Sequence, residues 1–430
     1  MAISGRVLLL AAVVLVLLVL FPSWSTVLLA LAALVLLVFL DVALAALLKK
    51  LQFRRMLPQN VRLGEPCTSE VLVSNDSSRR LQGEMRDAWQ PSAGAQKARQ
   101  ALDIPPSEQR KVSTTLLSTR RGELRTANLT VRAFGPLGLG ARQRTFSAPA
   151  SVKVLPPFHS KRHLPSKLKR LRELDGKAAV QIRGAGTEFD SLRDYVRGDD
   201  VRSIDWRATA RRQSVVVRTW RPERDRRVIV VLDTSRLSAV RIDDEPHLDT
   251  GMEAALLLAV LAERGGDRVD FVAFDRRVRA RTGSTAKGML LKNLVQSMAT
   301  LEPALIELDF SQIPQQVRAI SSHRALVVLL TALDSGAPEE GLLPIVQQLA
   351  QDHVVVVASV RDPALDALLT ERTTATQTYR AAAAERALLE REAISRQLRQ
   401  MGAEVVDAAP LALPPLLADA YIRLKAAGRL

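Results

Sequence analysis

The chain has 430 residues, 47% of them apolar, which is enough for two or three domains with buried cores and excludes a wholly disordered protein. Its 61 lysines and arginines outnumber 45 aspartates and glutamates, and the net charge of +16 favours anionic partners such as lipid surfaces, nucleic acids or acidic proteins. The single cysteine, Cys67, excludes an intrachain disulfide and a zinc site built on cysteines.

Residues 1–50 predict a transmembrane helical hairpin. Every residue of 7–21 is apolar, and after a break at 22–25 a second apolar run covers 26–40. Each run with its flanks approaches the roughly 20 residues that cross a bilayer as a helix. A cleaved signal peptide is the alternative, but the second run follows at once and no small-residue cleavage site precedes the break.

Basic residues flank both ends of this predicted hairpin. Arg6 precedes the first run, and four lysines and arginines follow the second run within 49–55. Because basic residues stay on the cytoplasmic side, we expect a two-pass protein of the plasma membrane with both termini in the cytoplasm. Asp41 is expected near the inner interface, and the hairpin is the expected contact with lipid.

Residues 51–157 predict a small β-sandwich-like domain. Short stretches with alternating polar and apolar residues are separated by turn-forming Asn, Asp, Pro and Gly clusters, as in all-β domains of about 100 residues. Nothing in this region resembles a catalytic set, so a spacer or docking role is expected. The predicted strands cover 69–74, 112–117, 128–133 and 151–155.

A basic connector, 158–227, has the highest charge density of the chain and opens with a basic helix candidate at 165–171. In its centre arginines alternate with acids, which favours bidentate Arg–Asp pairs. Such pairs can form a structural network, or they can present arginines to the carboxylates of a partner, and both interpretations remain open. The candidate partner-binding residues are Glu188, Arg193, Asp194, Tyr195, Asp199, Asp200, Arg202, Asp205, Trp206 and Arg211.

Residues 228–430 predict an α/β domain with a doubly wound parallel sheet, because apolar strand-like runs alternate with helical patterns. In such sheets sites form beyond the carboxyl ends of the strands, where Asp233 and Thr331 should emerge. The expected strands are 228–233, 268–274, 325–331, 353–360 and 404–407. The expected helices are 250–263, 287–299, 311–321, 342–350, 379–401 and 413–427.

Two segments carry a resemblance to known families. Val231–Arg236 (VLDTSR), followed by the α/β pattern, resembles the start of a von Willebrand factor type A domain. The segment 188–211, with its Leu-Arg-Asp-Tyr, Gly-Asp-Asp and Ile-Asp-Trp groups, is similar to the signature of the domain-of-unknown-function family 58 (DUF58). The resemblance covers the whole chain. It implies a bacterial inner-membrane protein that acts with a MoxR-type AAA+ ATPase in assembly or stress response.

The type A resemblance also implies a place for Mg²⁺, in a site written Asp-x-Ser-x-Ser with a threonine and an aspartate from other loops. Mg²⁺ takes about six oxygens in an octahedron. The match is degenerate, because Leu237 stands in the third position and Ala332 where an acid is expected. Alternatively, Asp233 and Ser235 bind loop amides. The candidate metal ligands are Asp233, Ser235 and Asp334, with Thr282 or Thr285 as the threonine.

The favoured hypothesis is therefore a membrane-tethered scaffold or adaptor without enzymatic activity. The five histidines lack metal-ligand spacing, and the sequence holds no Gly-x-x-x-x-Gly-Lys-Ser/Thr loop for ATP. One alternative is a metal-dependent hydrolase that uses the acids of the signature, such as Asp199 and Asp200, with Asp233. Another is binding of anionic lipid or, less favoured, nucleic acid through the basic residues of 161–172.

Overall fold

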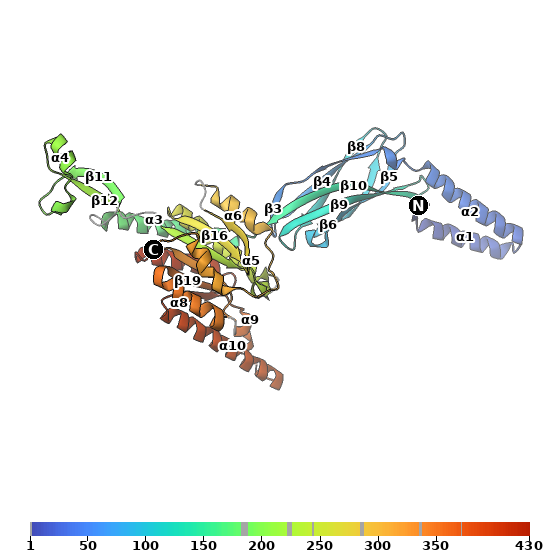
Figure 1. Cartoon of the computed structure of the whole chain (residues 1–430). Coiled ribbons are helices and arrows are strands. Elements are labelled where there is room, and N and C mark those ends of the chain that lie inside the picture. The colour runs from blue at the N-terminus through green and yellow to red at the C-terminus, as the bar shows by residue number, and fades with distance from the viewer. Residues whose placement is uncertain are drawn as a thin grey trace. The chain divides into compact units, whose positions relative to one another are not determined.

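The computed structural model describes residues 2–181, 188–221, 226–242, 245–283, 288–334, 338–370 and 372–430. The chain divides into two compact units, Met1–Leu155 and Pro156–Leu430 (Figure 1). The first unit holds two apolar helices and a β-rich module. The second holds an α/β sheet and the segment with the candidate partner-binding residues.

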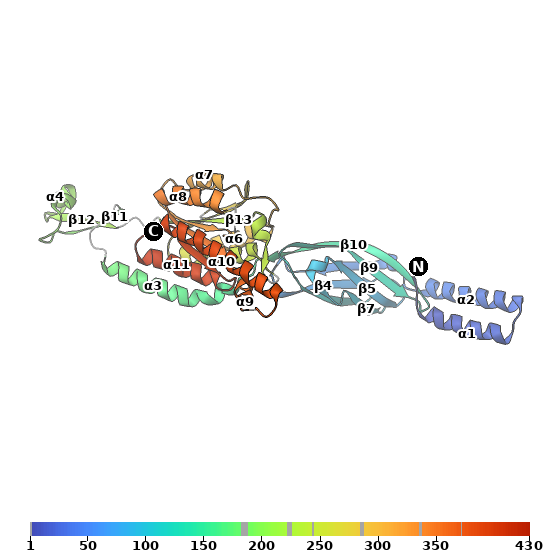
Figure 2. The ribbon, with the colours of Figure 1, turned by 90° about the horizontal axis from the view of Figure 1, so that it is seen from below.

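Two apolar helices, α1 (Arg6–Leu20) and α2 (Trp24–Leu44), lie side by side in both views (Figure 1, Figure 2). Ser23 is the N-cap of α2, where its side chain accepts the backbone N–H of Thr26. Within the described chain, one helical stretch, Trp24–Lys50, is long and apolar enough to cross a membrane, with a mean hydropathy of 3.0.

Helix α1 has only 15 residues. At 1.5 Å per residue it is about 22 Å long, shorter than a hydrocarbon core of about 30 Å. By length and composition the structure thus contains one candidate span in its described part. The predicted second pass is not established by it, because Pro22 and the Ser23 cap interrupt the apolar sequence before α1 reaches full length.

The β module consists of two sheets. Its strands are β1 (Ala2–Ile3), β2 (Leu51–Met56), β3 (Asn60–Arg62), β4 (Pro66–Asn75), β5 (Leu81–Trp89), β6 (Ala95–Gln96), β7 (Arg99–Ile104), β8 (Gln109–Leu117), β9 (Gly122–Phe134) and β10 (Gly140–Leu155). One sheet has the order β1-β10-β9-β5-β7 with β3 beside β10, and the other has the order β2-β4-β8-β6. Both sheets contribute side chains to the same two hydrophobic clusters.

Alternation along β4 shows why these residues form a strand. Cys67, Val71 and Val73 are buried while their neighbours are more exposed, the period of two that a half-buried strand requires. Val71 and Val73 share a cluster with Leu129 and Val131 of β9, which belongs to the other sheet. The expected strands 69–74, 112–117, 128–133 and 151–155 lie within β4, β8, β9 and β10.

The second unit is organised around one mixed sheet with the order β17-β16-β13-β18-β19-β20. Its strands are β13 (Arg227–Asp233), β16 (Arg268–Phe274), β17 (Val278–Thr282), β18 (Leu326–Leu330), β19 (Val354–Val360) and β20 (Glu404–Ala408). All neighbours are parallel except β17, which is antiparallel to β16. The chain order reverses between β13 and β18, which places a crevice at the carboxyl ends of these two strands.

Helices pack against both faces of this sheet. They are α5 (His247–Arg264), α6 (Leu290–Ala299), α7 (Ile313–Arg318), α8 (Leu343–Asp352), α10 (Ala375–Gln400) and α11 (Leu413–Ala426). The short helix α9 (Ala364–Leu368) contacts α10. On one face α7, α8 and α10 share a core cluster with Ile229 and Val231 of β13. On the other, Leu232 approaches α5 so closely that a Cβ at Gly251 would lie 2.8 Å from its Cδ1.

The remaining described elements belong to the connector and to one short hairpin. Helix α3 spans Leu164–Gln181 and includes the expected basic helix at 165–171. Strand β11 (Glu188–Asp194) pairs antiparallel with β12 (Val216–Arg221), and helix α4 (Trp206–Arg212) lies between them in sequence. The hairpin pairs β14 (Arg241–Ile242) with β15 (Glu245–Pro246).

Candidate functional site

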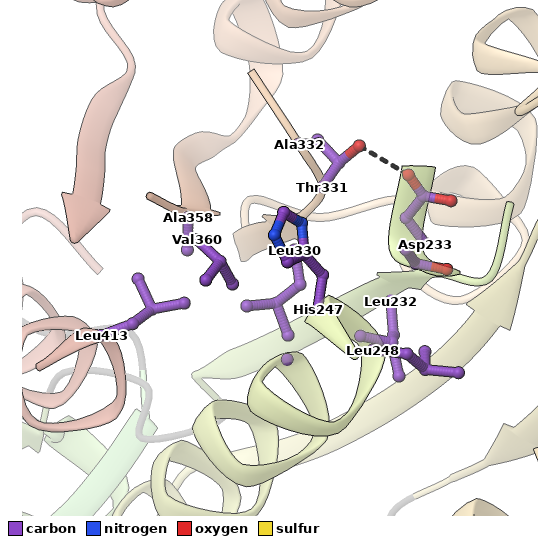
Figure 3. Close-up of a pocket in the computed structure, with 12 residues that line it drawn as sticks. Leu232, Asp233, His247, Leu248, Leu330, Thr331, Ala332, Ala358, Val360 and Leu413 are labelled. Carbon is purple, nitrogen blue, oxygen red and sulfur yellow. Dashed lines mark hydrogen bonds between the residues drawn. The ribbon is translucent and has the colours of Figure 1, made fainter. Parts of the chain in front are cut away.

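Asp233 lies at the carboxyl end of β13, buried at the crevice. Its Oδ1 accepts the backbone N–H of Ser235 at 2.7 Å, and its Oδ2 accepts the hydroxyl of Thr331 at 2.8 Å, the dashed line in Figure 3. Burial raises the pKa of Asp233, and this effect outweighs the hydrogen bonds from Ser235 and Thr331, which act in the opposite direction. The sequence correctly placed Asp233 and Thr331 together.

A second acid, Asp275, follows β16 at the same edge. Its carboxylate accepts the hydroxyl of Thr234 at 3.1 Å and the backbone N–H of Arg276 at 2.6 Å, and it forms an ion pair with Arg279. Burial raises the pKa of Asp275, but Arg279 and the backbone donors outweigh it, so the pKa lies below its ordinary value. Asp275 is therefore an ionised group whose charge is already balanced.

A small cavity of about 20 Å³ opens beside Asp233 (Figure 3). Its polar lining comes from Asp233, Thr331, Ser238 and His247, and the rest is apolar. The Nε2 of His247 is buried without a hydrogen-bond partner in the described structure. Burial lowers the pKa of this imidazole, which keeps it neutral near pH 7. A cavity of this size holds about one water molecule, which is too small for an organic substrate.

Asp334, the third proposed metal ligand, is held elsewhere. It forms an ion pair with Arg391 of α10, a buried guanidinium that also donates to Asp407 at 2.6 Å and to the Ser359 hydroxyl at 3.0 Å. This network turns the carboxylate of Asp334 toward α10. Among the contacts of the described residues, none joins Asp334 to Asp233.

The other proposed Mg²⁺ ligands are Ser235 and one of two threonines. The Ser235 hydroxyl is buried without a partner among the described residues, while Thr282 shares a hydrogen bond of 3.1 Å with Ser297. Thr285 lies outside the described residues. No group of three or more His, Cys, Asp or Glu that could hold a metal occurs in the described chain.

The candidate partner-binding residues lie in the segment 188–221, which we call the signature lobe. Two of its acids, Asp199 and Asp205, accept hydrogen bonds from other residues of the lobe. Asp199 accepts both terminal nitrogens of Arg193 at 2.6 and 2.7 Å and the N–H of Val196 at 2.9 Å. The hydrogen bonds from Arg193 hold the pKa of Asp199 below its usual value. For this pair the structural interpretation of the sequence pattern is correct.

Asp205 is the N-cap of α4. It accepts the backbone N–H of Arg207 at 3.0 Å and of Ala208 at 2.9 Å, and its second oxygen accepts Nε of Arg218 at 2.9 Å. The Ala208 amide, followed by Arg218, lowers the pKa of Asp205. Asp200 likewise caps a short 3₁₀ turn through the N–H of Arg202, at 3.0 Å.

Three more candidates have backbone roles in the lobe. Tyr195 is half-buried, and its N–H donates to the carbonyl of Val215 at 2.8 Å. Asp194 ends β11, opposite Val216. Glu188 opens β11 opposite Arg221, and its side chain lies outside the described part.

Side chains of α4 remain available for contact. Trp206 is 67% exposed. The guanidinium groups of Arg207 and Arg211, one helical turn apart, are exposed and make no hydrogen bond or ion pair with any described residue. We call Trp206, Arg207 and Arg211 the α4 surface. Arg202, just before α4, is exposed and unpaired in the same sense.

Sequence reasoning missed His247 and Arg391. His247 precedes the helix expected at 250–263 and belongs to no motif. Arg391 lies in a helix rich in Ala, Arg and Glu, a composition typical of a solvated face. The sequence offers one signal for Arg391: it is three residues from both Leu388 and Ile394, so it lies on the same, apolar face of the helix as these two residues.

The comparisons with known proteins find a family model of unknown function and uncharacterised relatives. The family model described as "Protein of unknown function DUF58" matches residues 191–399. Uncharacterized proteins of Mycobacterium bovis (strain ATCC BAA-935 / AF2122/97) and Mycobacterium tuberculosis (strain ATCC 25618 / H37Rv) are each 28% identical over 186 residues, which is 42% of this chain. The match covers 57% of the length of these curated relatives.

Solved structures show only weak overlaps. A β-glucosidase from Listeria innocua matches with a TM-score of 0.18 and 18% identity over 24% of this chain and 16% of that one. The CARDB domain of the PF1109 protein from Pyrococcus furiosus, crystallised with di-metal ions, has a TM-score of 0.18 and 19% identity over 24% of this chain and 86% of that chain. Both TM-scores are too low to bear on fold or function.

Proposed function

We propose that this protein is a membrane-anchored scaffold or adaptor that faces the cytoplasm and acts by binding another protein. The observation that carries the proposal is the α4 surface, where Trp206 is 67% exposed and the guanidinium groups of Arg207 and Arg211 make no hydrogen bond or ion pair with a described residue. Tryptophan and arginine are the residues most enriched in the energetic centres of protein interfaces. Two acids of the same lobe, Asp199 and Asp205, are satisfied internally, so the arginines of α4 are left for a partner.

The site at Asp233 supports contact rather than catalysis. Both carboxylate oxygens of Asp233 are engaged, and the adjoining cavity has room for about one water. A general base needs its proton acceptor within hydrogen-bonding reach of a substrate. Asp233 and Thr331 fit a structural role, in which they fix the loop after β13 to the end of β18.

We further propose a von Willebrand factor type A-like, doubly wound fold for the second unit and a two-pass anchor in the bacterial inner membrane with both termini in the cytoplasm. The parallel strands around Asp233, with helices on both faces, support the first proposal. The apolar stretch Trp24–Lys50 and the basic residues near it support the second. By resemblance, the partner is a MoxR-type AAA+ ATPase in assembly or stress response.

The test is capture of a partner by the full-length protein from a detergent extract, with and without ATP, after chemical crosslinking. Trp206→Ala is expected to lower the yield of the captured partner at least about tenfold, the loss of a 1.4 kcal/mol contact. Tyr379→Ala is the matched control, because Tyr379 is an aromatic residue of α10 that is 79% exposed. Its yield should equal that of the wild type.

Charge reversal gives a second arm. Arg207→Glu combined with Arg211→Glu should reduce capture, whereas Arg380→Glu, at an exposed position of α10, should not. The proposal is wrong if the wild type captures no protein in either nucleotide condition. Turnover of a small molecule by the purified protein, lost in Asp233→Asn, would contradict it as well.

A further inference from the structure

The turn that joins β9 to β10, residues 135–140, is bound to the end of α2 by a buried carboxylate. Asp41 is fully buried. Its Oδ1 accepts the backbone N–H of Leu137 at 2.7 Å, and its Oδ2 accepts those of Leu139 at 2.7 Å and Gly140 at 2.9 Å. Gly135 must be glycine here, because a Cβ at this position would lie 2.2 Å from the carbonyl oxygen of Asp41.

The start of α1 binds the same turn from the carbonyl side. Ser4 donates its N–H to the carbonyl of Leu139 at 2.9 Å and its hydroxyl to that of Gly138 at 2.5 Å. Arg6 donates from Nη1 to the carbonyl of Leu137 at 3.1 Å. The turn is thus attached to both apolar helices where they meet the β module.

Every backbone N–H of this turn is satisfied within the protein. Asp41 accepts three of them, Gly135 donates to the carbonyl of Gly140 at 3.1 Å, and Gly138 donates to that of Gly135 at 3.0 Å. Pro136 has no N–H. Irregular backbone enters a lipid environment only when its polar groups are hydrogen-bonded within the protein. The backbone N–H groups of this turn meet that condition.

The side chains at the tip of the turn are apolar. Leu137 is 53% exposed, Pro136 is exposed, and the remaining positions are glycines and the buried Leu139. The side chains of such a tip offer water no hydrogen bond, whereas a lipid layer would cover their apolar surface. Arginines stand close behind it, since Arg142 donates to the carbonyl of Val42 at 2.9 Å, and they suit the phosphate headgroups of the cytoplasmic leaflet.

The length of α2 sets the depth of the turn. Residues 24–40 are the part of the helix before Asp41 and carry no charged side chain, and at 1.5 Å per residue these 17 residues extend about 25 Å. That is the lower limit for a spanning helix. A membrane that holds α2 must therefore reach nearly to Asp41, and the turn, hydrogen-bonded to Asp41, lies at the same depth.

We propose that turn 135–140 is a lipid-contacting turn that lies in the interfacial layer of the membrane, with Leu137 among the upper acyl-chain carbons. This inference rests on the proposed anchoring by α2 and extends it to the β module. We take the occupant of the apolar tip to be lipid rather than a protein, because the turn lies against the candidate span: a Cβ at Gly140 would be 2.4 Å from Cγ2 of Val42 and 3.5 Å from Cγ1 of Val38. The first unit then contacts the bilayer at a fixed point.

The test uses the full-length protein in vesicles of phosphatidylcholine and phosphatidylglycerol, with or without bromine on the acyl chains. Single cysteines in a Cys67→Ala background carry an environment-sensitive fluorophore. The probe position is Leu137→Cys. The matched control is Leu117→Cys, an exposed leucine of the same module (41%) at the far end of β8. The near end of β8, Gln109, pairs with Ser74, which pairs with Gln52 shortly after α2. Leu117 lies eight residues further along β8, about 27 Å at the rise of a strand.

A third position, Leu31→Cys in α2, reports the anchoring itself. Leu31 is 58% exposed within the helix. We expect the emission at 31 and at 137 to shift to the blue and to lose intensity with brominated lipid, and the emission at 117 to do neither. The melting temperatures of the three labelled proteins should agree, which confirms that the labels leave the fold intact.

Three other quenching patterns would contradict the proposed lipid-contacting turn. Quenching at 31 without quenching at 137 overturns the lipid-contacting turn and leaves the anchoring standing. No quenching at either position overturns the anchoring together with this inference. Equal quenching at 117 and 137 shows that the module lies along the bilayer surface, which contradicts the fixed point of contact at the turn.

Discussion

Replacing Arg391 by methionine should destabilise the second unit at the edge of its sheet where strands β18, β19 and β20 end. The methionine keeps an apolar stem in α10 but removes the guanidinium that joins Asp334, Asp407 and the Ser359 hydroxyl. The Asp407 carboxylate is then left without its cation, and the carbonyl of Val360, which accepts Nη2 at 3.0 Å, loses its donor. Breaking a buried ion pair in this way typically costs about 3–5 kcal/mol.

A loss of that size lowers the melting temperature by about 6–20 °C, at roughly 2–4 °C per kcal/mol for domains of 150–250 residues. Amide hydrogen exchange of β18, β19 and β20, followed by mass spectrometry, localises the effect to the strands that the network joins. The matched control is Arg396→Met in the same helix. Arg396 is exposed and pairs with Glu392 at 3.3 Å, so its loss should stay within about 0.5 kcal/mol.

Equal melting temperatures for the two variants would refute the argument that the Arg391 network stabilises this edge. Arg391→Met combined with Asp407→Asn adds a further check. Once the carboxylate has been neutralised, removal of the guanidinium should cost less than it does in the wild type. Purely additive losses would mean that Arg391 stabilises this edge through Asp334, Ser359 and Val360 rather than through the charge of Asp407.

Three further outcomes are expected. Burial raises the pKa of Asp233 above its unfolded value of about 3.9, so ionisation of this carboxyl costs stability as the pH rises through the folded pKa. The melting temperature of Asp233→Asn should therefore rise relative to that of the wild type from about pH 4 toward pH 7. A difference between the two melting temperatures that does not change with pH would contradict this sign. Titrated Mg²⁺ should leave the melting temperature of the full-length protein unchanged, and a rise that Asp233→Ala abolishes would show that the ligand set binds the ion after all. Asp41→Ala leaves three buried N–H groups without an acceptor, at about 1–3 kcal/mol each, so urea unfolding in detergent should shift strongly for this variant and little for Asp76→Ala, an exposed acid of the same unit.

The strands of the second unit could be predicted because they are buried on both faces. Strands β13, β18 and β19 are continuous apolar runs, and their observed bounds differ from the expected ones by a residue at most. Strands β5 and β7 of the β module were not predicted. In β5, Gly83, Glu84 and Arg86 interrupt the alternation, and the strand is fixed by pairing with β9 rather than by its own pattern.

The candidate site was predictable only where local sequence determines it. Asp233 and Thr331 follow buried strands, so the strand pattern alone places them at one edge. The partner of Asp334 is separated from it by 57 residues and lies in a helix whose composition indicates solvent exposure. Likewise, β11 and β12 were expected as a connector, because their charges conceal a two-stranded pairing that becomes visible only in three dimensions.

The long strand β10 starts at the turn held by Asp41 and runs without a break in chain direction to Leu155, the last residue of the first unit. Its 16 residues extend about 50 Å. A single strand, whose pairing with β9 shifts register between Ser147 and Ala150, thus connects the turn at the end of α2 with the point where the chain enters the second unit. Force applied at that point would act along β10 on the hydrogen bonds from Leu139 and Gly140 to the Asp41 carboxylate.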